Sequence, residues 1–155
     1  MSARTTVLLL LALAGCGKAP PLGPVEVSLG EDACDACHMF IGERPYAAQL
    51  RMADGTVEKF DDIGCLFDRV AEKSPVATYV IAQETGEWID AKSAVYVLAP
   101  DLKTPMASGL ASFATTEKAK AEAERLKGTV LAYDQVSSAR DPEKKKVDSD
   151  PARPR

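Results

Sequence analysis

An alternating apolar pattern around Asp54-Gly55 constrains the fold of this chain most strongly. Alternate residues from Tyr46 to Met52 are apolar, which is the period of a half-buried β-strand. Asp54-Gly55 then favours a tight turn into a second strand over residues 56–60. The sequence therefore predicts a β-hairpin, which requires an antiparallel sheet.

A helix and a further strand are expected directly after this hairpin. Asp61 or Asp62 can cap a helix whose apolar residues follow at helical spacing: Ile63, Leu66, Phe67 and Val70. The helix should end before Ser74-Pro75, because the residue before a proline disfavours helical geometry. Residues 76–82 are apolar on both faces and read as a central strand. Residues 31–87 thus form a predicted ββαβ unit.

The same order of elements returns in the second half of the chain. The expected elements are strands at 93–98 and 109–114, a helix from Thr115 or Thr116 through Lys127 that ends at Gly128, and a strand at 129–133. We therefore predict the α+β class, with two tandem ββαβ units at residues 31–87 and 88–136. Residues 137–155 are rich in charge and proline and are expected to form a disordered tail.

The N-terminus has the pattern of a secretory signal. An apolar run at residues 7–14 leads to Leu13-Ala14-Gly15-Cys16, which resembles a bacterial lipobox. The run is shorter than the ~20 residues of a spanning helix, so cleavage before Cys16 and its lipidation are expected. The alternative is an ordinary signal that leaves Cys16 a thiol. By the sorting rule of lipoproteins, Gly17 favours the outer membrane, with the domain on the periplasmic face.

Length and charge exclude several classes of protein. Removal of residues 1–15 leaves enough chain for one ordinary domain behind a proline- and glycine-containing tether at residues 16–30. The full chain has a net charge of −4, which argues against a nucleic acid as partner. A single histidine and the lack of a glycine-rich phosphate loop give no sign of catalysis, so we expect no enzyme.

The candidate metal site is the sulfur-rich motif Cys34-Asp-Ala-Cys37-His-Met39. In an extended segment Cys37 and Met39 would project from one face, and thiolate with thioether favours Cu(I). Met39 could instead be a core residue. His38 could be a third donor, a group behind the ligands or an exposed residue.

Three further features leave alternatives open. Cys34 and Cys37 also fit a thiol–disulfide pair, although such motifs normally open a helix. Cys65 could be a buried small residue, a ligand or the disulfide partner of Cys34. Met106 falls in an expected loop and is the best remote thioether, whereas Met52 has strand periodicity and is expected in the core.

Taken together, these motifs resemble the nitrous-oxide reductase accessory lipoprotein family, NosL. The resemblance rests on four features: the lipobox, Cys34-x-x-Cys37-x-Met39-x-Ile41, the strand from Gly55 to Phe60 followed by Cys65-Leu66, and the segment from Pro105-Met106 to Tyr133-Asp134. It implies a duplicated ββαβ fold similar to the organomercurial lyase core. It also implies a metallochaperone that binds Cu(I) and delivers it for assembly of the copper centres of nitrous-oxide reductase.

The resemblance also implies site residues and partners. The family's Cys-x-Met copper pair falls on Cys37 and Met39, and the intervening position, often glycine in the family, is His38 here. Met106 matches a position where members often carry methionine. The implied partners are apo nitrous-oxide reductase and an ABC-type membrane assembly complex. The rival hypotheses are a periplasmic thiol–disulfide oxidoreductase that uses Cys34 and Cys37, and a structural lipoprotein with a disulfide.

Overall fold

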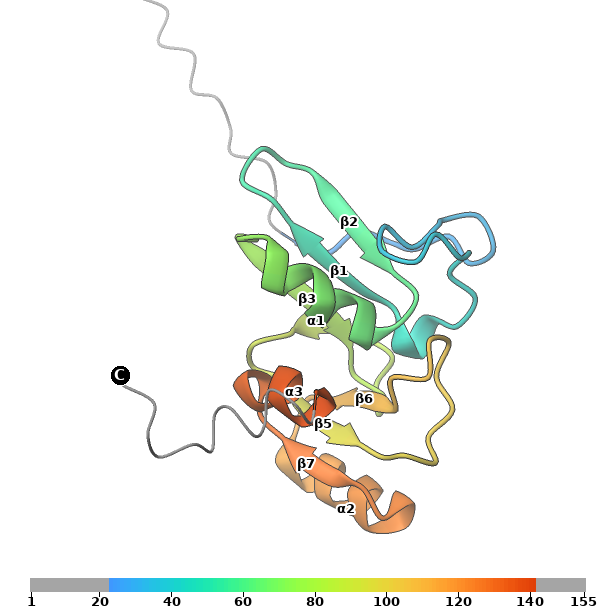
Figure 1. Cartoon of the computed structure of the whole chain (residues 1–155), viewed down its shortest axis with the longest axis vertical. Coiled ribbons are helices and arrows are strands. Elements are labelled where there is room, and N and C mark those ends of the chain that lie inside the picture. The colour runs from blue at the N-terminus through green and yellow to red at the C-terminus, as the bar shows by residue number, and fades with distance from the viewer. Residues whose placement is uncertain (1–22, 142–155) are drawn as a thin grey trace, which may run out of the picture.

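Two antiparallel sheets and three α-helices make up the computed structural model, which describes residues 23–141 (Figure 1). The α+β class is therefore confirmed. The elements are η1 (Arg44–Tyr46), β1 (Ala48–Arg51), β2 (Val57–Phe60), α1 (Ile63–Glu72), β3 (Ala77–Ile81), β4 (Trp88–Asp90), β5 (Val95–Leu98), β6 (Leu110–Phe113), α2 (Thr116–Leu126), β7 (Thr129–Leu131) and α3 (Tyr133–Arg140). Within residues 23–141 no helix is long and apolar enough to cross a membrane.

The first sheet contains the expected hairpin and central strand. Its strand order is β2-β1-β3-β4, and β1 pairs with β2 so that Ala48 lies opposite Phe60. Helix α1 packs across this sheet (Figure 1). Asp62, rather than Asp61, caps the helix, because its side chain accepts a hydrogen bond from the Gly64 N–H. The core between α1 and the first sheet contains fully buried apolar side chains: Leu50, Phe60, Ile63, Leu66 and Val80.

Strand β4 belongs to the first sheet, although the sequence pattern predicts no strand there. It pairs antiparallel with β3, so that Ile89 lies opposite Val80. The strand has only three residues, none of them fully buried, so it shows no clear alternation. Residues 88–90, assigned to the second unit from the sequence, thus complete the sheet of the first.

The second sheet has the strand order β6-β5-β7 and is covered by α2 (Figure 1). Thr115 caps α2 through the Lys118 N–H, as expected. A Cβ on Gly128 would come within 2.9 Å of the Leu98 carbonyl oxygen, which explains the glycine after this helix. The strand that follows the long helix pairs with the first strand of the hairpin in both sheets: β3 pairs with β1, and β7 pairs with β5. Duplication of one ancestral unit itself stays a prediction.

Helix α3 corrects the expected end of the domain. Tyr133 begins this helix rather than ending a strand, and residues 137–140, assigned to the tail, form its last turn. Val136 is fully buried, and the Arg140 side chain donates to the Gly64 carbonyl at 3.0 Å. The helix shows no apolar periodicity in the sequence, because only one of its side chains is buried. Residues 142–155 of the predicted tail lie outside the described residues.

The segment before η1 is attached to the first sheet rather than being a free tether. Gln49 of β1 accepts a hydrogen bond from the Val25 N–H and donates one to the Val25 carbonyl. Asp35 holds the outer edge of β2: its N–H donates to the Lys59 carbonyl, and its carboxylate accepts from the Lys59 N–H. The predicted tether therefore ends before Val25. The signal peptide and Cys16 lie outside the described residues.

Candidate metal centre

The sulfur motif forms a tight loop beside the outer edge of β2. The His38 N–H donates to the Cys34 carbonyl at 2.9 Å, and the Cys34 N–H donates to the Met39 carbonyl at 2.8 Å. His38 has a φ of +63°, in the left-handed region that favours glycine. The expected extended segment from Cys37 to Met39 is therefore wrong, because the backbone turns at His38.

Cys34 is a fully buried sulfur that accepts several hydrogen bonds. The Cys65 thiol is the strongest donor to its Sγ, and the backbone N–H groups of Cys37, Asp61 and Ala36 also donate to it. These donors outweigh burial and hold the pKa of Cys34 well below its ordinary value of 9.0. Donation to Cys34, with burial second, raises the pKa of Cys65. The pair therefore favours a thiolate at Cys34.

Cys37 lies at the rim of the cluster and is only half-buried. Its Sγ donates to the Asp61 Oδ1 at 3.4 Å and accepts from the Met39 N–H. Burial raises the pKa of Cys37 to about 11, and burial with the nearby Cys34 raises the pKa of Asp61 to about 6. Cys37 thus links the buried thiols to the protein surface.

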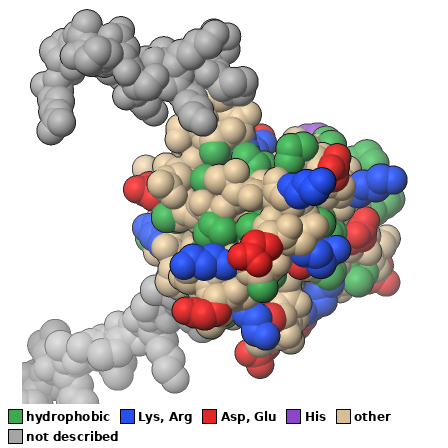
Figure 2. Space-filling view, turned by 90° about the horizontal axis from the view of Figure 1, so that it is seen from below, with side chains coloured by type: hydrophobic (Ala, Val, Ile, Leu, Met, Phe, Trp, Pro, Cys, Tyr) green, Lys and Arg blue, Asp and Glu red, His purple; other side chains and the backbone are tan. Residues whose placement is uncertain are grey.

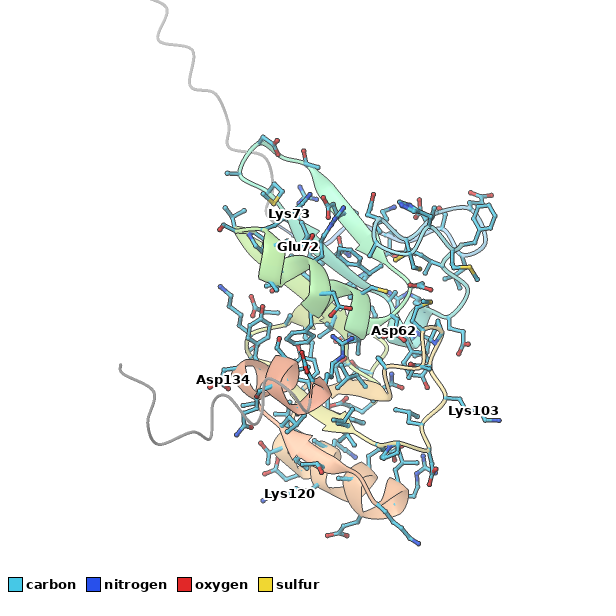
Figure 3. The ribbon with its side chains drawn as sticks, in the orientation of Figure 1. Asp62, Glu72, Lys73, Lys103, Lys120 and Asp134 are labelled. Carbon is cyan, nitrogen blue, oxygen red and sulfur yellow. The ribbon has the colours of Figure 1, made fainter. Side chains whose placement is uncertain are left out.

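Three thiols and one carboxylate form a compact set of possible metal ligands. The Sγ atoms of Cys34, Cys37 and Cys65 and one carboxylate oxygen of Asp61 all lie within 4.8 Å of one another. All three cysteines are free thiols. In Figure 3 sulfur atoms lie near Asp62, at the start of α1. This cluster can bind a metal ion.

The other predicted donors lie at the surface. Met39 is 60 % exposed, and its neighbours His38 and Phe40 are exposed as well. Met106 is 45 % exposed in the loop between β5 and β6. This loop is fixed to the start of α1, because Asp62 Oδ2 accepts from the Thr104 hydroxyl at 2.6 Å and from the Met106 N–H at 2.9 Å. Met39 is thus not the core residue considered as an alternative.

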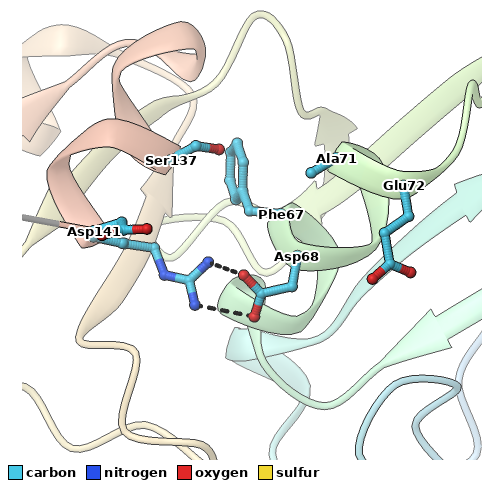
Figure 4. A pocket seen from close by; sticks show the side chains of 7 residues that line it. Phe67, Asp68, Ala71, Glu72, Ser137 and Asp141 are labelled. Atoms are coloured by element: carbon cyan, nitrogen blue, oxygen red, sulfur yellow. Dashed lines mark hydrogen bonds and ion pairs between the residues drawn. The ribbon is translucent and has the colours of Figure 1, made fainter. Parts of the chain in front are cut away.

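A separate surface cavity of about 350 Å³ lies between α1 and α3 (Figure 4). Arg140 and Asp68 pair across it at 3.0 Å. The lining residues are Phe67, Asp68, Ala71, Glu72, Ser137, Arg140 and Asp141, none of which carries sulfur. Neither the thiol cluster nor the exposed methionines therefore line this cavity. Figure 2 shows acidic and basic side chains interspersed over the visible face, without a basic patch there.

Comparison with known proteins places this arrangement in a family. The NosL family model matches residues 24–140, which include the thiol cluster and both loops with exposed methionines. This chain belongs to the NosL family. The copper-binding lipoprotein NosL of Stutzerimonas stutzeri is 31 % identical over 149 residues, covering 86 % of this chain and 78 % of that protein.

A solved NosL structure has the same fold. The crystal structure of the copper chaperone NosL from Shewanella denitrificans matches with a TM-score of 0.66 at 20 % identity. The match covers 75 % of this chain and 96 % of that one.

The sequence analysis did not identify Asp61 as a member of the cluster of three thiols and one carboxylate. It explained both Asp61 and Asp62 by helix capping, although one cap position can use only one of them. The carboxylate that does not cap the helix, Asp61, could therefore have been considered as a further ligand. For Cys65 the structure favours a polar role over that of an isolated core residue, since its thiol contacts Cys34.

Proposed function

We propose that this chain is a membrane-anchored Cu(I) carrier that delivers copper for assembly of the copper centres of nitrous-oxide reductase. Cys37 and Met39 bind the ion at the surface, and Met106 and His38 are further candidate donors. The observation that carries the proposal is a half-buried thiol at Cys37, followed two residues later by the thioether of Met39, which is 60 % exposed. Soft donors of this kind suit Cu(I).

Exposure of the thioether favours transfer over permanent storage. An acceptor must replace the ligands of the carrier one at a time, and it can reach Met39 without unfolding the loop. A thioether carries no charge and needs no deprotonation, so it can leave the ion readily. The chain acts in this scheme as a carrier and not as an enzyme.

Membership of the family supports the proposed anchoring and partners. The relative in Stutzerimonas stutzeri is named a copper-binding lipoprotein, which supports lipidation of Cys16 after the predicted signal. Two or more acyl chains would hold the domain at the periplasmic face of the cell envelope, with Gly17 favouring the outer membrane. The proposed partners are apo nitrous-oxide reductase and an ABC-type membrane assembly complex.

A Cu(I) titration against a competing chelator tests the proposal. Every sample is the full chain with Cys16→Ser, so that Cys16 adds no thiol, and is kept reduced without thiol reagents. We expect tight binding of one ion, loss of tight binding in Cys37→Ser, and slower release to an added chelator in Met39→Ala. Met52→Ala is the matched control, because Met52 packs against the core. Tight binding that survives Cys37→Ser would refute the proposal.

A thiol–disulfide activity of Cys34 and Cys37 is the second candidate. The lowered pKa of Cys34 favours it, since thiolates attack disulfides. Cys34, however, is fully buried, and the motif forms a loop rather than the start of a helix. Reduction of a model disulfide that is lost in Cys34→Ser and kept in Met39→Ala would favour this candidate over the copper carrier.

A further inference from the structure

The thiol cluster has a buried side that the exposed copper pair does not use. Its donors come from three places: Cys34 and Cys37 from the sulfur loop, Asp61 from the end of β2, and Cys65 from the first turn of α1. Cys34 and Cys65 are 0 % and 7 % exposed. Two soft donors thus lie behind Cys37, on the side away from solvent.

The spacing of the three sulfurs fits one metal ion. Thiolates that share an ion at ~2.3 Å stand about 3.8–4.0 Å apart in tetrahedral or trigonal geometry. The ligand atoms of the cluster lie within 4.8 Å of one another without an ion present. Closure of the cluster around an ion therefore needs movements of less than an ångström, which side-chain rotation supplies.

The surroundings of the Cys34 sulfur also suit a metal thiolate. The backbone N–H of Cys37 donates to the Cys34 Sγ at 3.5 Å. A backbone donor aimed at a buried sulfur stabilises negative charge on it, and a metal-bound thiolate carries such charge.

We propose that Cys34, Cys37 and Cys65 form an inner three-sulfur Cu(I) position, from which the ion passes to the exposed Cys37 and Met39 pair. This inference rests on the proposed function and extends it. Cys37 is shared by both positions because it lies at the rim. The ion exchanges Cys34 and Cys65 for Met39 while it stays bound to Cys37.

The chemistry of the cluster favours Cu(I) over Zn(II) in this position. Cu(I) is satisfied by thiolates alone, whereas Zn(II) would take the Asp61 oxygen as a fourth ligand to complete a tetrahedron. Asp61 Oδ1 lies 3.4 Å from the Cys37 Sγ and already serves as its hydrogen-bond acceptor. On binding, the ion replaces thiol protons, including the one between Cys65 and Cys34, and these protons leave to solvent.

X-ray absorption of the Cu(I)-loaded full chain, again with Cys16→Ser, tests the inner position without any further substitution. We expect three sulfur neighbours at one ion per chain. In Cys65→Ser and in Cys34→Ser the sulfur count should fall to two, with an affinity at least about tenfold lower against the same chelator. Met39→Ala should keep three sulfurs and slow only the release. Thermal unfolding of each apo variant reports whether it folds.

Several outcomes would overturn the inner position. Two sulfurs in the parent chain would do so, as would copper binding that is unaffected in folded Cys34→Ser and Cys65→Ser variants. Displacement of Cu(I) by one equivalent of Zn(II) would identify a zinc site instead. A Cys34–Cys65 disulfide would also exclude the inner position, because neither sulfur could then bind the ion. It would be detected in protein taken from the cell envelope and alkylated at once to block its free thiols. In these cases, loss of binding in Cys37→Ser would still support the copper carrier, so the two proposals fail separately.

Discussion

Replacement of Asp62 by alanine should destabilise the protein by about 3 kcal/mol. The fully buried Asp62 side chain accepts three hydrogen bonds: from the Gly64 N–H at 2.6 Å, the Thr104 hydroxyl at 2.6 Å and the Met106 N–H at 2.9 Å. Loss of the helix cap costs about 1 kcal/mol. Each of the other two donors, left without its acceptor, costs about 1 kcal/mol more.

Urea unfolding at pH 7, followed by circular dichroism, measures this change. Thr104→Val removes one of the three bonds and should cost about 1 kcal/mol, whereas Asp101→Ala, an exposed substitution in the same loop, should stay within about 0.5 kcal/mol of the parent. Amide exchange at residues 104–109 should accelerate in Asp62→Ala, because the loop loses its anchor. A cost below about 1 kcal/mol for Asp62→Ala would refute this account of the junction.

Three further predictions concern single positions. His38→Gly should unfold with a free energy about 1 kcal/mol higher than His38→Ala, because only glycine tolerates the φ of +63° without strain; equal stability in thermal unfolding would contradict this. Burial raises the pKa of Glu58, but hydrogen bonds from Lys73 and Arg69 outweigh it and hold the pKa below 4.5. Stability from this carboxylate is present above pH 4.5 and is lost as the pH falls through the lowered pKa, so the advantage of the parent over Glu58→Gln in urea unfolding should shrink in acid rather than stay constant. Val136→Ala should cost about 2 kcal/mol in the same assay, and a cost under 0.5 kcal/mol would mean that α3 is not docked.

Elements with strong periodicity and a cap could be predicted from the sequence. The hairpin around Asp54-Gly55 and both long helices combine an apolar pattern with turn or capping residues, so local and tertiary preferences agree. Strand β4 and helix α3 lack this agreement. Each is short and is held by a few tertiary contacts, such as the Arg140 hydrogen bond to Gly64, which leave no period in the sequence.

The site was predictable only as far as its residues are neighbours in the chain. The clustering of Cys34, Cys37 and Met39 is visible in the sequence, but the turn at His38 is not, because few non-glycine residues adopt a positive φ. Contact between Cys65 and Cys34 depends on how α1 packs against the loop before β1. A distance of this kind is set by the fold and has no local signal.

The sulfur loop also protects the sheet from association with other chains. Asp35 occupies the outward N–H and carbonyl of Lys59, in a four-residue strand that would otherwise present an open edge. An open edge is a template for intermolecular strand pairing and aggregation. If oxidation or loss of packing unfolded the sulfur loop, the chain would therefore expose the unpaired edge of β2 as well as its thiols. Protection of the sheet edge and integrity of the thiol cluster thus depend on the same loop.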